Sequence, residues 1–235
     1  MRSVAPFGIV AHRGLVAGAT ENTLEAFRSA RTAGVDAVEF DVRLTHDRVA
    51  VVHHNYYVNA AAGSPIFAID STAIAAPTLR DVLEEFAGRF GLEIEVKGPE
   101  PEAADVVAGL LSPLAAHWET IEVTSSETVI LQHLGAICPS LATALLFPAS
   151  EPWMRHDVVA YAALHRARGA GAAAVHLHAS QLTPEVVATI RAGGVDVHAH
   201  SVNDDDALRT ASSLAVPWIC TDAPERALAF RRALG

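Results

Sequence analysis

The sequence predicts an α/β fold built from eight strand–helix units, and three observations lead to that class. Short runs rich in Val, Ile and Leu alternate with segments rich in Ala, Leu, Glu and Arg, which is the pattern of a parallel sheet covered by helices. The length of 235 residues and the hydrophobic content of 51% suffice for one large core. Polar residues gather where the predicted strands end. Together these features predict a single domain over residues 1–235, a closed (β/α)8 barrel of the TIM type with its active site at the carboxyl ends of the strands.

The individual elements follow from the same pattern, taken in order. We expect barrel strands at 7–11, 37–42, 92–96, 121–123, 142–147, 174–177, 195–199 and 218–220. We expect helices at 21–32, 78–88, 101–115, 154–168, 184–192, 204–214 and 224–234. Thr20 should cap the first helix and Gly34 should end it. An extra strand at 49–52 and an irregular stretch at 55–77 form a small insertion after the second strand, too long for an ordinary connection.

Composition excludes several classes of function. The formal charge of −10, from 27 acidic and 17 basic residues, argues against nucleic acid or an anionic membrane surface as a partner. No apolar run reaches the ~18 residues of a membrane span, and the N-terminal residues lack a leader pattern. Cys138 and Cys220 have no metal-binding spacing and are expected to be buried thiols. These features predict a cytoplasmic protein without stable membrane insertion, and they leave the oligomeric state open.

The second strand carries the first chemical signal. Side chains alternate across a strand, so Glu39 and Asp41 lie on one face while Val38 and Phe40 lie on the other. Two carboxylates this close repel each other, and a divalent cation between them relieves that repulsion. The alternative is an edge strand with two solvated acids. His54 follows the extra strand and adds a group that can transfer protons beside the carboxylates.

Further polar residues fall at the predicted strand ends, which favours a site over a solvated edge. They are His12 and Arg13 after the first strand, Glu95 and Lys97 at the third, His178 after the sixth, His200 at the seventh, and Thr221 and Asp222 at the eighth. His178 and His200 could contact a substrate or could be hydrogen-bonded structural residues. His46 and His53 are interpreted as lying outside the catalytic set.

A series of short motifs runs along almost the whole chain in a distinctive order. It comprises Ala11-His12-Arg13-Gly14, Glu21-Asn22-Thr23, Glu39-Phe40-Asp41, His54, Glu95-Val96-Lys97, Val202-Asn203-Asp204 and Thr221-Asp222-Ala223-Pro224. Together these motifs resemble the glycerophosphodiester phosphodiesterase family, which consists of TIM barrels that use one divalent metal, Ca²⁺ or Mg²⁺. The resemblance implies hydrolysis of a small phosphodiester to glycerol 3-phosphate and an alcohol.

The resemblance also implies a role for each matching residue. The metal ligands would be Glu39, Asp41 and Glu95, the general acid and base would be His12 and His54, and the phosphate would contact Arg13 and Lys97. Their position at the strand ends, rather than a family role, adds His178 and His200 to the expected substrate-binding set. In that family the 2-hydroxyl of glycerol is thought to attack phosphorus, and water then opens a cyclic phosphate. Glu21 and Asn22 would lie next to the metal ligands, although they could equally complement a helix dipole.

Two departures from the family pattern bear on the substrate. Asn55 stands where the family usually has Asp beside the catalytic histidine, and His200 stands where it commonly has Trp. Asn55 keeps a hydrogen-bonding carbonyl but loses the charge. An alternative activity is therefore of the phospholipase D type, on lysolipids or another phosphodiester. A third reading, from a different class, is a noncatalytic barrel that binds a phosphodiester.

Overall fold

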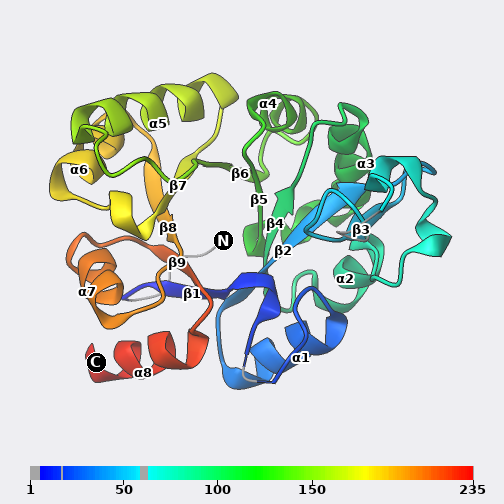
Figure 1. Ribbon diagram of the computed structural model, residues 1–235, viewed down its shortest axis with the longest axis horizontal. Coiled ribbons are helices and arrows are strands. Elements are labelled where there is room, and N and C mark those ends of the chain that lie inside the picture. Colours follow the sequence, from blue (N-terminus) through cyan, green and yellow to red (C-terminus); the bar gives the residue numbers. More distant parts are fainter. Residues whose placement is uncertain (1–5, 17, 59–62, 235) are drawn as a thin grey trace.

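The computed structural model describes residues 6–16, 18–58 and 63–234, and its strands close into a barrel surrounded by helices (Figure 1). The parallel barrel strands are β1 (Gly8–Ala11), β2 (Ala37–Leu44), β4 (Gly91–Val96), β5 (Ile121–Ser125), β6 (Ala142–Leu146), β7 (Ala174–His178), β8 (Asp196–His200) and β9 (Trp218–Thr221). The first strand pairs with both β9 and β2, which closes the sheet. The predicted (β/α)8 barrel is confirmed.

The helices form the outer ring and follow the strands in sequence. They are α1 (Leu24–Ala33), α2 (Leu79–Phe86), α3 (Glu102–Leu111), α4 (Thr128–Ile137), α5 (His156–Ala170), α6 (Pro184–Ala192), α7 (Asp205–Ser213) and α8 (Pro224–Leu234). Short 3₁₀ segments are η1 (His12–Gly14), η2 (Ile66–Ala68), η3 (Ser71–Ala73), η4 (Ser112–Thr120) and η5 (Ala179–Gln181). The main hydrophobic core lies between this ring and the outer face of the strands. No helix in the described ranges is long and apolar enough to cross a membrane.

Three expectations for the helices need correction. The first helix begins at Leu24, and its N-cap is Thr23 rather than Thr20, because Asn22 has a left-handed backbone (φ 57°) that interrupts helical geometry. The third helix ends at Leu111, and the chain continues as 3₁₀ turns past Pro113, whose ring disfavours an uninterrupted α-helix. No helix was expected over Thr128–Ile137, where α4 follows β5 and packs against both β5 and β6.

The insertion after the second strand extends one side of the barrel. β2 continues past the rim, and β3 (Ala50–Val52) folds back on it in antiparallel pairing. Thr45 and Asp47 stabilise the turn, since the Thr45 hydroxyl donates to Asp47 Oδ1 over 2.6 Å. Residues 59–62 of the expected irregular stretch lie outside the described residues. The backbone amide of His53 donates to the Asp41 carbonyl over 3.0 Å, so this fold-back carries His54 to the strand ends.

The barrel interior changes character from one end to the other. At the amino ends of the strands, Val10, Ala37, Trp218 and Cys220 form a small apolar cluster separate from the main core. Gly8 has no room for a Cβ, because the Trp218 ring would lie 2.2 Å from it. Every second residue of a strand faces the same side, so the positions above this cluster point into the barrel. Those positions are polar.

Candidate active site

Three buried carboxylates from two neighbouring strands converge at the carboxyl end of the barrel. β2 provides Glu39 and Asp41, and β4 provides Glu95, which pairs in register with Asp41. One oxygen from each can be chosen so that all lie within 4.8 Å of one another. Burial and the neighbouring carboxylates raise the pKa of Glu39 well above its ordinary value. Without a compensating cation, Glu39 therefore tends to hold a proton.

Arg13 and Lys97 neutralise part of this carboxylate charge. The Lys97 ammonium lies 2.6 Å from Glu95 Oε1 and 3.1 Å from Asp41 Oδ1, and Arg13 Nε lies 3.2 Å from Asp41 Oδ2. Burial alone would raise the pKa of Asp41. The charge of Lys97, a hydrogen bond from Asn22 and the nearby His54 and Arg13 have the larger combined effect, so the pKa of Asp41 is lowered from its ordinary value. We call these five residues, Glu39, Asp41, Glu95, Arg13 and Lys97, the upper layer.

The upper layer fits a hard divalent cation. In the described part of the chain, Asp41 Oδ1 is buried and has no hydrogen bond of good geometry, although the Lys97 ammonium is close. Carboxylate oxygens are the ligands that Ca²⁺ and Mg²⁺ prefer, and three converging carboxylates repel one another until a cation binds. Glu39, Asp41 and Glu95 are therefore the residues that could hold such an ion, and their role as ligands stays a prediction.

His12 follows β1 in the 3₁₀ turn η1, next to Glu39. Its Nδ1 lies 2.5 Å from Asp222 Oδ1, and its Nε2 lies 3.9 Å from Glu39 Oε2. Asn203 holds Asp222 in place, because its side-chain amide donates to Asp222 Oδ2 over 2.7 Å. Burial raises the pKa of Asp222, but hydrogen bonds from His12 and Asn203 and the charge of His12 lower it below its ordinary value. Asp222 thus orients the ring of His12 and can balance its charge when protonated.

His54 also lies beside the carboxylates, near Asp41. Its Nδ1 is 3.1 Å from Asn55 Oδ1, and because the amide carbonyl can only accept, Nδ1 carries the proton of the neutral ring and Nε2 is its unprotonated nitrogen. Arg43 holds the backbone of His54, since its Nε donates to the His54 carbonyl over 2.8 Å. Sequence reasoning missed Arg43, which continues the alternation of Glu39 and Asp41 along β2. That alternation is the signal that could have found it.

Glu21 and Asn22 lie in the loop before α1 and contact the upper layer. Glu21 Oε1 accepts a hydrogen bond from Arg13 Nη1 over 3.1 Å, and the Asn22 amide donates to Asp41 Oδ2 over 2.9 Å. Arg13 itself has a left-handed backbone (φ 52°), a strained conformation that the surrounding contacts hold in place. The structure therefore brings both residues beside the upper layer, where they orient its side chains, and the helix begins only after them.

His178 and His200 come together at the ends of β7 and β8, which pair in register. Their ring centroids are 5.3 Å apart. Burial, followed by the charges of His176 and His178, lowers the pKa of His200 to about 3, so this ring is neutral at ordinary pH. His178 Nδ1 lies 2.7 Å from the Ser180 hydroxyl. The substrate-binding role of this pair stays a prediction.

A second group of polar residues lies inside the barrel, two residues closer to the amino ends of the strands, and sequence reasoning missed it. Its members are Glu93 on β4, Glu122 on β5, His176 on β7 and His198 on β8, all buried, and we call them the lower layer. Burial lowers the pKa of His176, but Glu93 and Glu122 outweigh it and raise the value to about 9. Burial raises the pKa of Glu93 to about 7, against the opposing charge of His176. Three of the four, Glu93, His176 and His198, stand two residues before a predicted site residue. Residues two apart on a strand face the same side, and this alternation is the signal that could have found them.

Contacts outside the upper layer are made by His46 and His53, which the sequence placed outside the catalytic set, and by Ser125. His46 pairs with Asp70, and His53 Nε2 lies 3.4 Å from the Tyr57 carbonyl. The buried Ser125 hydroxyl donates to the Val96 carbonyl over 2.6 Å, which makes it a structural contact between β5 and β4.

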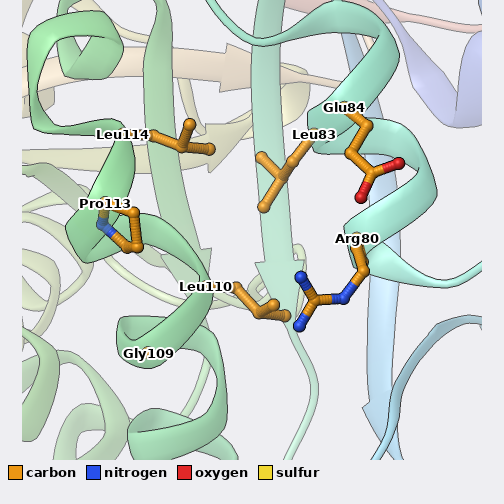
Figure 2. Close-up of a pocket in the computed structure, with 7 residues that line it drawn as sticks. All are labelled: Arg80, Leu83, Glu84, Gly109, Leu110, Pro113 and Leu114. Carbon is orange, nitrogen blue, oxygen red and sulfur yellow. The ribbon is translucent and has the colours of Figure 1, made fainter.

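A hollow of about 330 Å³ on the outer ring contains none of the candidate residues. It lies between α2 and the junction of α3 with η4 (Figure 2). Its lining is formed by Arg80, Leu83, Glu84, Gly109, Leu110, Pro113 and Leu114. The candidate catalytic residues lie instead at the carboxyl ends of the strands.

The fold and the site together define a class of protein, a (β/α)8-barrel enzyme with three converging carboxylates and two histidines beside them. Comparison with known proteins agrees. The model of the glycerophosphoryl diester phosphodiesterase family matches residues 12–226, and the chain belongs to that family. The reading as a hydrolase rather than a noncatalytic barrel is thereby confirmed.

Individual relatives match over nearly their full length. A glycerophosphodiester phosphodiesterase of Bacillus altitudinis is 27% identical over 252 residues, covering 95% of this chain and 97% of the relative. One from Caldanaerobacter subterraneus subsp. tengcongensis is 25% identical over 240 residues, covering 92% and 94%. A phosphodiesterase of Oleispira antarctica, solved with its product sn-glycerol-3-phosphate, superposes with a TM-score of 0.79 at 22% identity, covering 94% of this chain and 95% of that one. The last likeness concerns the fold.

Proposed function

We propose that this enzyme hydrolyses glycerophosphodiesters to glycerol 3-phosphate and an alcohol, with a divalent cation in the upper layer. The observation that carries the proposal is the position of two histidines beside one cluster of carboxylates, His12 near Glu39 and His54 near Asp41. A bound Ca²⁺ or Mg²⁺ would supply positive charge for the phosphoryl oxygens. The family match and the product named for the Oleispira antarctica neighbour support the substrate class.

The residues of this chain divide the remaining work. Arg13 and Lys97 present fixed positive charges beside the carboxylates, where they would bind phosphate oxygens and stabilise the charge that develops at phosphorus. Nε2 of His54 is the unprotonated nitrogen of the neutral ring, because Nδ1 donates to the neutral Asn55, and this suits a base that takes a proton from the attacking hydroxyl. His12 has Asp222 to balance its protonated form, which suits an acid that gives a proton to the leaving alcohol.

The test of this proposal is a turnover screen with glycerophosphocholine, glycerophosphoethanolamine and glycerophosphoglycerol, with release of glycerol 3-phosphate as the readout. Exhaustive chelation should abolish turnover, and added Ca²⁺ or Mg²⁺ should restore it. Full turnover after chelation would refute the need for a cation. Failure to release glycerol 3-phosphate from any of these diesters would refute the substrate class.

A second candidate substrate class is lysolipids, and one observation favours it. The insertion beside His54 carries an aromatic group in which the Tyr56 ring lies 5.1 Å from that of Tyr57 and 5.7 Å from that of Phe67. Tyr57 and Phe67 are exposed, and such a surface can contact an acyl chain. Lysophosphatidylcholine therefore belongs in the same screen, and release of choline from it at a higher kcat/KM than from glycerophosphocholine would favour this class.

We also propose a cytoplasmic location. Two free, buried cysteines are in keeping with a reducing compartment. Fractionation of cells that produce the protein at its natural level would test this, and recovery outside the cytoplasm would refute it.

A further inference from the structure

The lower layer places charged and metal-binding groups where a barrel of this type ordinarily has branched apolar side chains. Glu93, Glu122, His176 and His198 are at most 7% exposed. In the described part of the chain, all ion pairs of Glu93 and Glu122 are with histidines, in contrast to the fixed cations Arg13 and Lys97 of the upper layer. Buried charges of this kind are costly unless they are paired or bind a metal ion.

Three atoms of the lower layer form a compact triangle. Glu122 Oε2 lies 3.0 Å from His176 Nε2 and 3.4 Å from His198 Nδ1, and the two ring nitrogens lie 3.1 Å apart. A tetrahedral ion with bonds of about 2.0–2.1 Å holds its ligand atoms about 3.3 Å from one another. The three edges match that spacing, so one ion could contact all three atoms without rearrangement of the strands.

The ligand chemistry selects the kind of ion. Two imidazole nitrogens and one carboxylate oxygen suit zinc and neighbouring transition metals, whereas the oxygen-only upper layer suits Ca²⁺ or Mg²⁺. We propose that Glu122, His176 and His198 bind a divalent transition-metal ion of the zinc class, one layer below the active site and separate from its cation. The proposal does not depend on the identity of the substrate.

Glu93 gives a second, independent indication of a ligand. A histidine that binds a metal through one nitrogen commonly directs the other toward a carboxylate, which fixes the orientation of the ring. His176 has this arrangement, with Nε2 in the triangle and Nδ1 3.3 Å from Glu93 Oε1. Among the described residues, His176 Nδ1 and Glu93 Oε2 are also buried without a well-formed hydrogen bond. Binding of an ion through Nε2 would orient the His176 ring so that Nδ1 donates a hydrogen bond to Glu93.

The position of the ion indicates its effect. It would link β5, β7 and β8 across the barrel, directly beneath His178 and His200, which pair in register just as His176 and His198 do. The lower pair of rings, with centroids 4.9 Å apart, supports the upper pair. An ion at this depth has no direct access to a substrate, so it serves to hold strands and the upper histidines in position.

The experiment measures transition metal in the intact protein. Cells are grown with added Zn²⁺, the protein is freed of loosely bound ions by gel filtration, and zinc is measured by mass spectrometry. The wild type should retain about one zinc ion per chain. His198→Leu, which restores an apolar interior residue, should fall to background, and Glu93→Gln should weaken binding about 10–100-fold. Protein produced with Co²⁺ should show the visible absorption of a tetrahedral centre, and His198→Leu should not.

Two variants locate the ion. Asp41→Asn removes a carboxylate of the upper layer and should leave zinc retention unchanged. His133→Gln alters an exposed histidine that pairs with Asp105 and should also leave it unchanged. If His198→Leu does not fold, the isosteric Glu122→Gln replaces it with the same expected loss. Background zinc and no cobalt absorption in the wild type would overturn the proposal, as would retention that depends on Asp41 or His133 and is insensitive to the lower layer.

Discussion

The upper and lower layers of the barrel interior contain similar carboxylates but balance them differently. In the upper layer, Arg13 and Lys97 carry permanent positive charge beside Asp41 and Glu95. In the lower layer, the negative charge of Glu122 is balanced by His176 and His198. Burial alone would raise the pKa of Glu122, but these two rings lower it well below its ordinary value. Permanent cations suit a site that must bind an anion. Histidines suit buried carboxylates whose charge is balanced within the fold, either by protonated imidazole rings or by a metal ion that the rings bind.

The comparison predicts that the layers respond in opposite ways to loss of one carboxylate. Glu39→Gln should reduce turnover to background and remove Ca²⁺ binding, because one of the three proposed cation ligands is lost. Its unfolding free energy without metal should be nearly unchanged, because burial already favours the protonated form that Gln resembles. Turnover, calorimetry and urea unfolding measure the three quantities, with Glu84→Gln on α2 as the control. Normal turnover by Glu39→Gln would remove Glu39 from the ligand set.

The histidines beside the upper layer should affect catalysis more than binding. His12→Ala and His54→Ala should each lower kcat by about 10²–10⁴, the ordinary worth of a positioned acid or base, while Ca²⁺ binding persists. Each variant should lose one limb of the pH profile of kcat/KM, and the apparent pKa values of the wild-type profile belong to the two interacting groups as a pair. A near-normal kcat for His54→Ala would indicate that another group acts as the base, and His200 would be the first residue to test.

Loss of a lower-layer carboxylate should instead destabilise the fold. Glu122→Leu leaves two buried histidines without their shared partner, and breaking a buried ion pair costs about 3–5 kcal/mol. Chemical unfolding of this variant beside Glu39→Gln, both in chelator, measures the difference between the layers. Equal stabilities of the two variants would show that the layers are not distinct in this respect.

A smaller effect is expected at the histidine pair on the rim. His200→Trp should change the ratio of kcat/KM values among choline, ethanolamine and glycerol diesters more than it changes turnover of the best substrate. The larger indole alters the wall beside His178, whereas the upper layer keeps its ligands. An unchanged substrate profile would mean that His200 does not contact the substrate.

The smallest effect concerns the insertion, which lies outside both layers. Hydrogen bonds from the Ser71 hydroxyl, from Thr45 and from the Ser71 amide lower the pKa of Asp47 from 3.8 to about 2. Because the folded value is depressed, this contribution to stability is present above pH 3.8 and is lost as the pH falls toward 2. Asp47→Asn should remove that part of the acid dependence. Proteolysis of the insertion across this range measures it, and identical profiles for both proteins would contradict the assignment.

The sequence by itself determined the local structure and much of the candidate site. Alternating apolar runs and helical segments indicated the eight units, and the helix over Pro184–Ala192 lies where the pattern placed it. Strand alternation put Glu39 and Asp41 on one face. These features depend on neighbours in the chain, so short-range patterns reveal them. The same patterns were ambiguous before α1, because Thr20 and Thr23 are both suitable caps.

Only the tertiary structure decided which distant residues meet. Closure of the barrel places β1 beside β9, which brings Asp222 to His12 across 210 positions of the chain. It likewise brings Glu122 on β5 to His176 on β7 and His198 on β8. A short-range pattern shows that a side chain faces inward, but the partner across the barrel depends on strand order and stagger. The orientation of His12 and the existence of the lower layer follow from that geometry.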